Sequence, residues 1–443
     1  MYFRDKKGLV FLIALVFVLV VALGAAAFMA LSTNEITIMR NQNNSTRAFY
    51  IAEAGIERAV AWLRSQATPP IAVVGPVNQN LAATGYAGSY RYNIAPNPGN
   101  PVPPALGIYV YTVTSTSTIG IATRSIITQE TMELNTFARY SYFTSNESFL
   151  IWWWEIPVWF TTGTLLEGPV HTNDQYHISG DPIFDGPVSS VATTIDYMHG
   201  GPPNDNPQFR QGLTLGADPV DTALLTSNIL QAAAAGVGGY TFNGNTEIVL
   251  IGNGTMDVTN SNLVPPMQNM PLPVNGAVFV TNGDLGISGT LDGRLTVGSS
   301  RDVIIRDDIR YANDPRVNPN SDDILAIMSD RDIIVDEHAA DGNPQRDLDI
   351  FATLIAIGET PPHEDDDGSL YVERYWSGLK GLLTVYGGLI QKRRGPVGTF
   401  NSRTNRRVSG YDKDYHFDIR MNANPPPHIP RIITFGRLSW QEV

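Results

Sequence analysis

Residues 9–31, LVFLIALVFVLVVALGAAAFMAL, form an unbroken apolar run without a single charged side chain. At the rise of an α-helix they would span about 34 Å, which exceeds the roughly 30 Å hydrocarbon core of a bilayer. Arg4, Lys6 and Lys7 precede the run, and basic residues are typical of the cytoplasmic flank of a membrane span. The sequence therefore predicts a single-pass membrane helix with a cytoplasmic N-terminus and the bulk of the chain outside.

The helical pattern continues beyond the apolar run. Residues 32–66 contain no proline, and Gly55 is their only glycine. Apolar residues recur there mostly three and four positions apart, which is the pattern of one apolar stripe on an α-helix. The prolines Pro69 and Pro70 end the pattern, because proline cannot continue a helix. We therefore expect one helix over residues 9–66, about 87 Å long.

The second half of this helix is expected to pack against partner subunits or against the chain's own globular part. The residues that we expect to form the packing stripe are Ile36, Met39, Phe49, Ala52, Ile56, Val60 and Leu63.

A basic pair before Gly8 and Leu9, together with residues 47–57 (RAFYIAEAGIE), resembles the N-terminal helix of the type IV pilin family. The resemblance is to the PilX-like minor pilins and the GspK-like pseudopilins. In this family a prepilin peptidase cuts after the glycine, so the resemblance implies that residues 1–8 are a leader peptide and that Leu9 becomes the methylated N-terminus. Major pilins have a glutamate at the fifth mature position, where this chain has Ile13, and this departure implies a minor subunit.

The resemblance implies a function in assembly rather than catalysis. The chain would be a minor pilin-like subunit of a bacterial type IV pilus or a related secretion filament, anchored in the inner membrane. Its partners would be other pilin-like subunits and the prepilin peptidase. Two alternatives for the N-terminus stay open, namely a secretory signal peptide cut near the alanines at 25–27 and an anchor that is never processed.

The amino-acid composition limits the fold classes and partners that are expected for the rest of the chain. Among 443 residues there are 40 glycines and 30 prolines, and charged residues make up only 16%. This composition favours an α+β, mostly β protein with many turns. The net charge of −13 makes a nucleic-acid partner unexpected, and the absence of cysteine excludes a disulfide framework.

Two β regions are expected after the helix. Residues 67–146 contain stretches that alternate polar and apolar residues, which predicts a small antiparallel β head packed on the helix. Residues 147–443 contain short apolar runs separated by Gly, Asn and Asp, which predicts a large extracellular β domain. Within that domain, residues 221–235 read as a helix that starts at Asp221.

The large domain contains internal repeats. Residues 168–170 (GPV) recur 18 residues later, and RDVII at 301–305 is echoed by RDIIV at 331–335. Such spacing favours a β-solenoid, in which each turn of the chain stacks on the next, over a β-sandwich. Glycines at 387 and 388, with neighbouring segments, also resemble an uncharacterised domain found behind pilin-like helices.

Two clusters could bind a ligand. Residues 151–160 (IWWWEIPVWF) form an aromatic cluster that could stack on carbohydrate or could close the end of the core. A basic patch at residues 392–394, with Arg403, Arg406, Arg407 and Lys413, is interleaved with aspartates and is more typical of a salt-bridged loop. A surface or carbohydrate ligand is therefore the candidate partner of this domain.

No pattern of residues assigns catalysis. His171 and His177 lie six residues apart without a zinc motif, and the acidic residues 363–368 (HEDDDG) do not have the spacing of an EF-hand calcium loop. We expect no cofactor, no metal and no enzymatic activity. The rival hypothesis is a membrane-tethered β-solenoid enzyme acting on polysaccharide, which would need two carboxylates about 5–10 Å apart in one groove.

Overall fold

The computed structural model describes residues 6–66, 68–81, 88–103, 106–151, 154–343, 345–358 and 368–443. The chain divides into two compact units, and each is described here by itself. The first unit comprises Met1–Leu134 and Ile433–Val443, and the second comprises Asn135–Ile432. The second unit is thus an insertion between two segments of the first.

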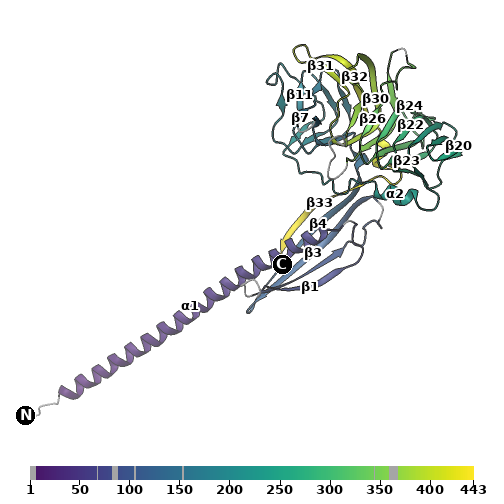
Figure 1. Cartoon of the computed structure of the whole chain (residues 1–443). Helices are drawn as coiled ribbons and strands as arrows, with labels where there is room; N and C mark the ends of the chain where they lie inside the picture. Colours follow the sequence, from purple (N-terminus) through teal and green to yellow (C-terminus); the bar gives the residue numbers. More distant parts are fainter. Residues whose placement is uncertain are drawn as a thin grey trace, which may run out of the picture. The chain divides into compact units, whose positions relative to one another are not determined.

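The first unit begins with helix α1, which runs from Lys6 to Arg64 without a break (Figure 1). The predicted long N-terminal helix is confirmed, and its end lies close to the predicted one. The last turn is closed by Gln66, whose side-chain amide donates to the carbonyl of Trp62 at 3.0 Å. The prolines at 69 and 70 follow directly, where the helical hydrogen bonds can no longer be made.

The second half of α1 packs on a five-stranded sheet in the order β1-β2-β3-β4-β33. Strands β2, β3 and β4 pair antiparallel along their full lengths, as the alternating pattern predicts. The strands are β1 (Val74–Asn80), β2 (Ser89–Pro96), β3 (Gly107–Ile119), β4 (Ala122–Thr136) and β33 (Arg431–Glu442). The C-terminal strand β33 was expected within the large domain of residues 147–443, but it completes the sheet of the first unit.

The packing of α1 on the sheet is close at Gly55. A Cβ atom at this position would lie 2.1 Å from Oγ of Ser115 and 2.9 Å from Cδ2 of Tyr90. Glycine is therefore the residue that lets the helix backbone approach strands β2 and β3.

The second unit is mostly β and forms a large curled sheet of 23 strands. Most neighbouring strands are parallel and come from successive passes of the chain. One set of such strands consists of β5 (Tyr142–Asn146), β10 (Val170–Thr172), β13 (Val188–Ser190), β16 (Leu213–Leu215), β17 (Tyr240–Asn243), β21 (Ala277–Thr281), β23 (Arg294–Ser299), β25 (Ile324–Ser329), β28 (Thr353–Ala356) and β30 (Leu379–Arg393).

A second set of parallel strands alternates with the first along the chain. It consists of β9 (Leu165–Glu167), β12 (Ile183–Asp185), β15 (Gln208–Phe209), β18 (Thr246–Ile251), β22 (Leu285–Leu291), β24 (Val303–Tyr311), β26 (Ile333–Val335), β27 (Leu348–Ile350), β29 (Leu370–Val372) and β32 (Arg406–Phe417). A small separate sheet contains β8 (Phe160–Thr161), β11 (His177–Ser179) and β14 (Asp196–Tyr197). The remaining elements are β6 (Ser148–Ile151), β7 (Trp154–Pro157), β19 (Thr255–Asn260), β20 (Leu263–Pro271), β31 (Gly398–Asn401), η2 (Phe137–Arg139), α2 (Asn228–Ala234) and η3 (Ile419–Asn422).

The order of strands in the first set shows that the chain enters this sheet in its middle. From β5 it continues to β10, β13 and β16 on one side. It then passes through α2 and re-enters at the other end as β17, from which β21, β23, β25 and β28 lead back to β30. Strand β30 pairs in parallel with β5, so two arms of the sheet meet at these two strands.

The repeated segments are register partners. Val170 pairs with Val188, and Val303 pairs with Ile333, each time between parallel strands. Repetition in the sequence thus reflects equivalent positions on adjacent strands, which β-branched residues occupy in both pairs. The solenoid itself stays a prediction, as does the sandwich alternative.

Helix α2 is shorter than predicted. It starts at Asn228 after Ser227, whereas the sequence pattern placed the start at Asp221. The carboxylate of Asp221 instead accepts from the backbone N–H of Ala223 at 2.8 Å, which makes a tight turn. Aspartate favours such turns as well as helix N-termini, and here the turn prevails.

Candidate functional site

The first half of α1 exposes a long, continuous apolar surface. Every residue from 9 to 31 is exposed, with side-chain exposures from 50% at Val16 to 72% at Phe28 among the large apolar residues. By length and composition this stretch of helix could cross a membrane. A contiguous apolar surface of this size requires lipid or other apolar helices as its cover. We call residues 9–31 the uncovered helix segment.

The predicted packing residues fall into two groups. Ala52, Ile56, Val60 and Leu63 are buried at 4% exposure or less in the core between α1 and the sheet. Phe49 is half-buried at the edge of this core, where its ring lies 6.1 Å from that of Trp440 on β33. Ile36 and Met39, in contrast, are 46% and 61% exposed. Only the two residues nearest the uncovered helix segment are therefore free to contact another subunit.

Gly8 and Leu9 lie in the first turns of α1. Ile13, at the fifth position after Gly8, is 60% exposed and places no charge on the uncovered helix segment. Cleavage after Gly8 stays a prediction.

The C-terminal strand is tied to the helix and the sheet by Arg437. Its guanidinium donates to the carboxylates of Glu130 on β4 at 2.6 Å and of Glu57 on α1 at 3.0 Å. Glu130 is only 3% exposed, so this ion pair lies at the edge of the core. One residue of β33 thus links three elements of the first unit.

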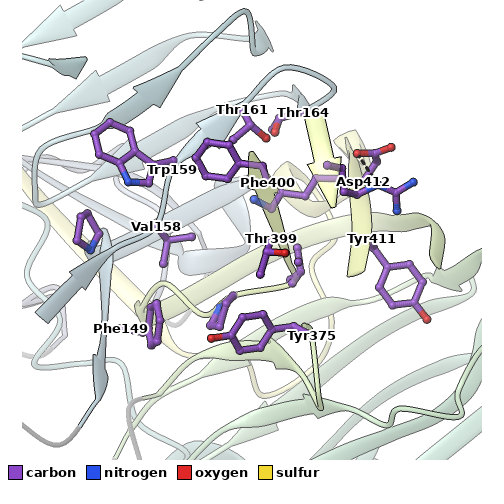
Figure 2. A pocket seen from close by; sticks show the side chains of 16 residues that line it. Phe149, Val158, Trp159, Thr161, Thr164, Tyr375, Thr399, Phe400, Tyr411 and Asp412 are labelled. Atoms are coloured by element: carbon purple, nitrogen blue, oxygen red, sulfur yellow. Dashed lines mark ion pairs between the residues drawn. The ribbon is translucent and has the colours of Figure 1, made fainter. Parts of the chain in front are cut away.

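The second unit contains a pocket of about 240 Å³, which we call the aromatic pocket (Figure 2). Its walls come from three segments that are distant in sequence, near residues 149–164, near Tyr375, and in the β31–β32 hairpin. The side chains labelled in Figure 2 that line it are Phe149, Val158, Trp159, Thr161, Thr164, Tyr375, Thr399, Phe400, Tyr411 and Asp412.

Charged groups lie at one side of the aromatic pocket. Nε of Arg407 pairs with Oδ1 of Asp412 at 3.1 Å, and the same guanidinium donates to the carbonyl of Gly381 at 3.0 Å. Lys413, the next residue on β32, also lines the pocket. Within the described part of the chain, its ammonium group has neither a hydrogen bond nor an ion pair within 4.0 Å.

The surroundings of Lys413 disfavour its positive charge. Burial holds the pKa of Lys413 well below its usual value, and the charge of Arg394 lowers it further, while Glu147 and Asp412 oppose the shift. Lys413 also borders a second, much smaller void of about 10 Å³. A half-buried amine without an ion pair among the described residues therefore lines the aromatic pocket.

Arg394 positions the wall of the pocket that carries Trp159. Its guanidinium pairs with Glu147 at 2.9 Å and donates to the carbonyl oxygens of Val158 at 2.8 Å and Trp159 at 3.3 Å. The guanidinium carbon also lies 3.4 Å from the centroid of the Phe160 ring. These contacts fix the backbone at Val158 and Trp159.

The residues of the predicted aromatic cluster and of the predicted basic patch lie in different environments. In the aromatic cluster, Trp159 lines the pocket, Phe160 is core, and Trp154 is 67% exposed, while residues 152–153 lie outside the described residues. In the basic patch, Arg393 pairs with Glu155 at 2.9 Å, and Arg394 and Arg407 are paired as described above. Three of the seven residues of the patch, Arg393, Arg394 and Arg407, thus form ion pairs.

The predicted histidines have separate partners. The ring of His171, 3% exposed, contacts the hydroxyl of Ser189 at 2.8 Å, and that of His177 contacts Asp196 at 2.8 Å. Across the residues that the structure describes, no group of three or more His, Asp or Glu side chains is arranged to hold a metal ion. The acidic residues 363–367 lie outside the described residues.

Sequence reasoning did not find the aromatic pocket as a site. Trp159 and Lys413 were each noted, but in clusters about 250 residues apart that were interpreted separately. Tyr375, Thr399 and Phe400 belong to no motif that the sequence analysis singled out.

Comparisons with known proteins found a family model and solved structures that are similar to this chain. The family described as "Domain of unknown function (DUF4900)" matches residues 108–193, which run from β3 to β13. No curated protein matches the chain. A similar solved structure is the crystal structure of the competence-associated pilin ComZ from Thermus thermophilus, at 11% identity and a TM-score of 0.35, over 90% of this chain and 97% of that one.

Proposed function

We propose that this chain is a pilin-like subunit that assembles with other membrane-spanning helices through the first half of α1. The observation that carries the proposal is the division of one unbroken helix into two parts. Its second half is core of the chain's own sheet, whereas residues 9–31 have no cover among the described residues. A rigid connection of this kind would transmit the position of the helix in a filament to the five-stranded sheet of the first unit.

Topology follows from the same helix. Lipid covers the uncovered helix segment before assembly, and neighbouring helices replace the lipid afterwards. The basic residues at positions 4, 6 and 7 favour a cytoplasmic N-terminus in the inner membrane and an extracytoplasmic bulk. The absence of a glutamate at Ile13 supports a minor subunit, since major pilins use that side chain to pair with a neighbouring N-terminus.

We also propose that the second unit is a β-solenoid displayed for surface contact or at a filament tip. Parallel partners separated by one pass of the chain support this proposal, for example Val170 with Val188 and Leu285 with Val303. An insertion of 298 residues (135–432) into the head sheet is bulky for a repeating filament subunit, which supports a low copy number. The domain limits proposed from sequence, 67–146 and 147–443, are replaced in this account by the two units.

No observation favours the polysaccharide-cleaving alternative. Among the described residues, the aromatic pocket is lined by one carboxylate, Asp412, which is held by Arg407. Glycoside hydrolysis uses two carboxylates that face each other across the scissile bond.

Mass spectrometry of the mature N-terminus tests the proposed class of protein. We expect a chain that begins with a methylated Leu9, and one that begins with Met1 when the prepilin peptidase gene is deleted. A mature N-terminus after the alanines at 25–27 would show a secretory signal peptide, and an intact Met1 in wild-type cells would show a plain anchor. Either result would overturn processing by the prepilin peptidase.

A further inference from the structure

The aromatic pocket contains a cation without a counter-ion. Arg407 is neutralised by Asp412 and Arg394 by Glu147, at 3.1 Å and 2.9 Å. Lys413 has no such partner among the described residues, although it lines the same pocket. Lys413 is half-buried, and partial burial of an ammonium without a partner is unfavourable, so an anion that enters the pocket would be favoured there.

The walls of the pocket favour a ring that carries hydroxyl groups. Trp159, Phe400 and Tyr375 offer aromatic surface, and Figure 2 shows their rings arranged around the pocket. The hydroxyls of Thr161 and Thr164 add polar groups to the same wall. Aromatic faces beside hydroxyls suit a ligand with an apolar face and a polar edge, such as a sugar ring.

The volume limits the ligand to a single ring. Pockets for drug-sized ligands measure roughly 300–1,000 Å³. The aromatic pocket, at about 240 Å³, lies just below this range and would hold one sugar residue of a longer chain.

We propose that the aromatic pocket binds a single acidic sugar residue, a hexuronate, with its carboxylate against Lys413 and its ring against Trp159 and Phe400. This inference deepens the proposed role in surface contact and rests on it, because it names the class of ligand that the second unit would recognise. The ligand could come from a surface polysaccharide or as a free sugar acid, and both present the same ring and carboxylate.

Binding of the carboxylate is expected to take up a proton. Burial lowers the pKa of Lys413, whereas an adjacent anion favours its charged form and would raise that pKa. The titratable or charged groups that face Lys413 are Arg394, Glu147, Asp412, Tyr142 and Tyr415. Arg394 and Arg407 are held by their own carboxylates, so Lys413 is the group whose protonation responds.

Calorimetric titration of the full chain in detergent micelles tests the proposal. The probes are galacturonate, its neutral counterpart galactose, and trigalacturonate as the polymeric form. We expect galacturonate to bind at least tenfold more tightly than galactose, with proton uptake seen as a dependence of the heat on the buffer. Tighter binding of trigalacturonate would identify a polysaccharide as the source, and equal binding would identify the free sugar acid.

Two variants distinguish binding in the aromatic pocket from a general electrostatic attraction between the protein and the acidic sugar. Lys413→Met should lower the affinity for galacturonate at least tenfold and abolish the proton uptake. Arg403→Met removes a positive charge from the exposed tip of the same hairpin and should change the affinity less than twofold.

Equal affinity for galactose and galacturonate, or no binding of galacturonate at millimolar concentrations, would overturn the proposal. This comparison uses the wild-type chain, so it holds even if Lys413→Met does not fold. Failure would leave assembly through α1 untouched, because α1 takes no part in the measurement.

Discussion

Arg394 and Glu147 form an ion pair of 2.9 Å in which the two side chains are 2% and 0% exposed. Arg394 follows β30 and Glu147 follows β5, the two strands at which the arms of the large sheet meet. The pair therefore joins segments almost 250 residues apart in sequence, directly after the parallel strands β30 and β5.

Breaking this pair should strongly destabilise the second unit. Glu147→Gln leaves a buried guanidinium without its counter-ion, and we expect a loss of about 3–5 kcal/mol in the free energy of unfolding. Urea unfolding of the full chain, followed by tryptophan fluorescence, measures this loss. Asp185→Asn is the control, because its pair with Arg210 at 3.2 Å is exposed and should contribute at most about 1 kcal/mol. Equal effects of the two variants would contradict the account.

A larger side chain in place of Gly55 should push α1 away from the sheet. A Cβ there would meet Ser115 Oγ at 2.1 Å, so Gly55→Val requires the helix or the strands to shift, at a cost of about 1–3 kcal/mol. We expect a lower melting temperature and faster proteolysis of the first unit. Gly24→Ala is the matched control, because nothing lies within 4 Å of a Cβ at Gly24. An unchanged melting temperature for Gly55→Val would show that the helix does not pack as described.

Loss of Arg437 should loosen the C-terminal strand. Arg437→Met leaves the nearly buried Glu130 without its charged partner, and we expect a loss of about 1–3 kcal/mol. Hydrogen exchange of the β33 amides should accelerate accordingly. Arg124→Met removes an exposed pair with Glu442 at 3.1 Å and should have a smaller effect. The reverse order of the two effects would argue against the central position of Arg437.

The contribution of His416 to the stability of the second unit should be lost as the pH rises past neutrality. Burial opposes the charging of His416, but its hydrogen bonds to Glu167 and Asp414 outweigh burial and raise the pKa of His416. A raised folded-state pKa contributes stability that is complete below the unfolded-state pKa of about 6.5 and is lost as the pH rises through the folded-state value. Because His416 on β32 contacts β9, this linkage lies between the two arms of the sheet.

Thermal unfolding at pH 6 and pH 8 measures this dependence. We expect the stability lost on His416→Gln to be larger at pH 6 than at pH 8, because His416 contributes to stability only in its charged form. An identical pH dependence in the variant would assign the effect to other groups.

The parts of the fold that depend on local pattern could be predicted. Helix α1 was predicted from an apolar run followed by a three-and-four stripe without proline, and β2–β4 from alternation along each strand. The position of β33 could not be predicted, because the pattern of residues 431–442 indicates a strand but not its partner. The meeting of β30 with β5 likewise depends on which distant strands pair.

The candidate site likewise could not be predicted from local sequence patterns, because distant segments form it. Trp159 and Lys413 are visible as an aromatic and a basic residue, but only the fold brings them to one pocket. Arg394 looked like part of a surface patch and is among the most buried side chains, because its counter-ion Glu147 lies on a distant segment. The start of α2 was misplaced because Asp221 serves a turn as readily as a helix N-terminus.

Photo-cross-linking in living cells tests the central claim most directly, that residues 9–31 form the surface of assembly. Benzoylphenylalanine at Leu19, which is 59% exposed on the uncovered helix segment, should form adducts that mass spectrometry identifies as a second copy or another pilin-like subunit. The same probe at Ile121, 83% exposed at the turn between β3 and β4, should form few such adducts. Equal adducts from both positions, or adducts from Leu19 with lipid alone, would contradict assembly through this helix.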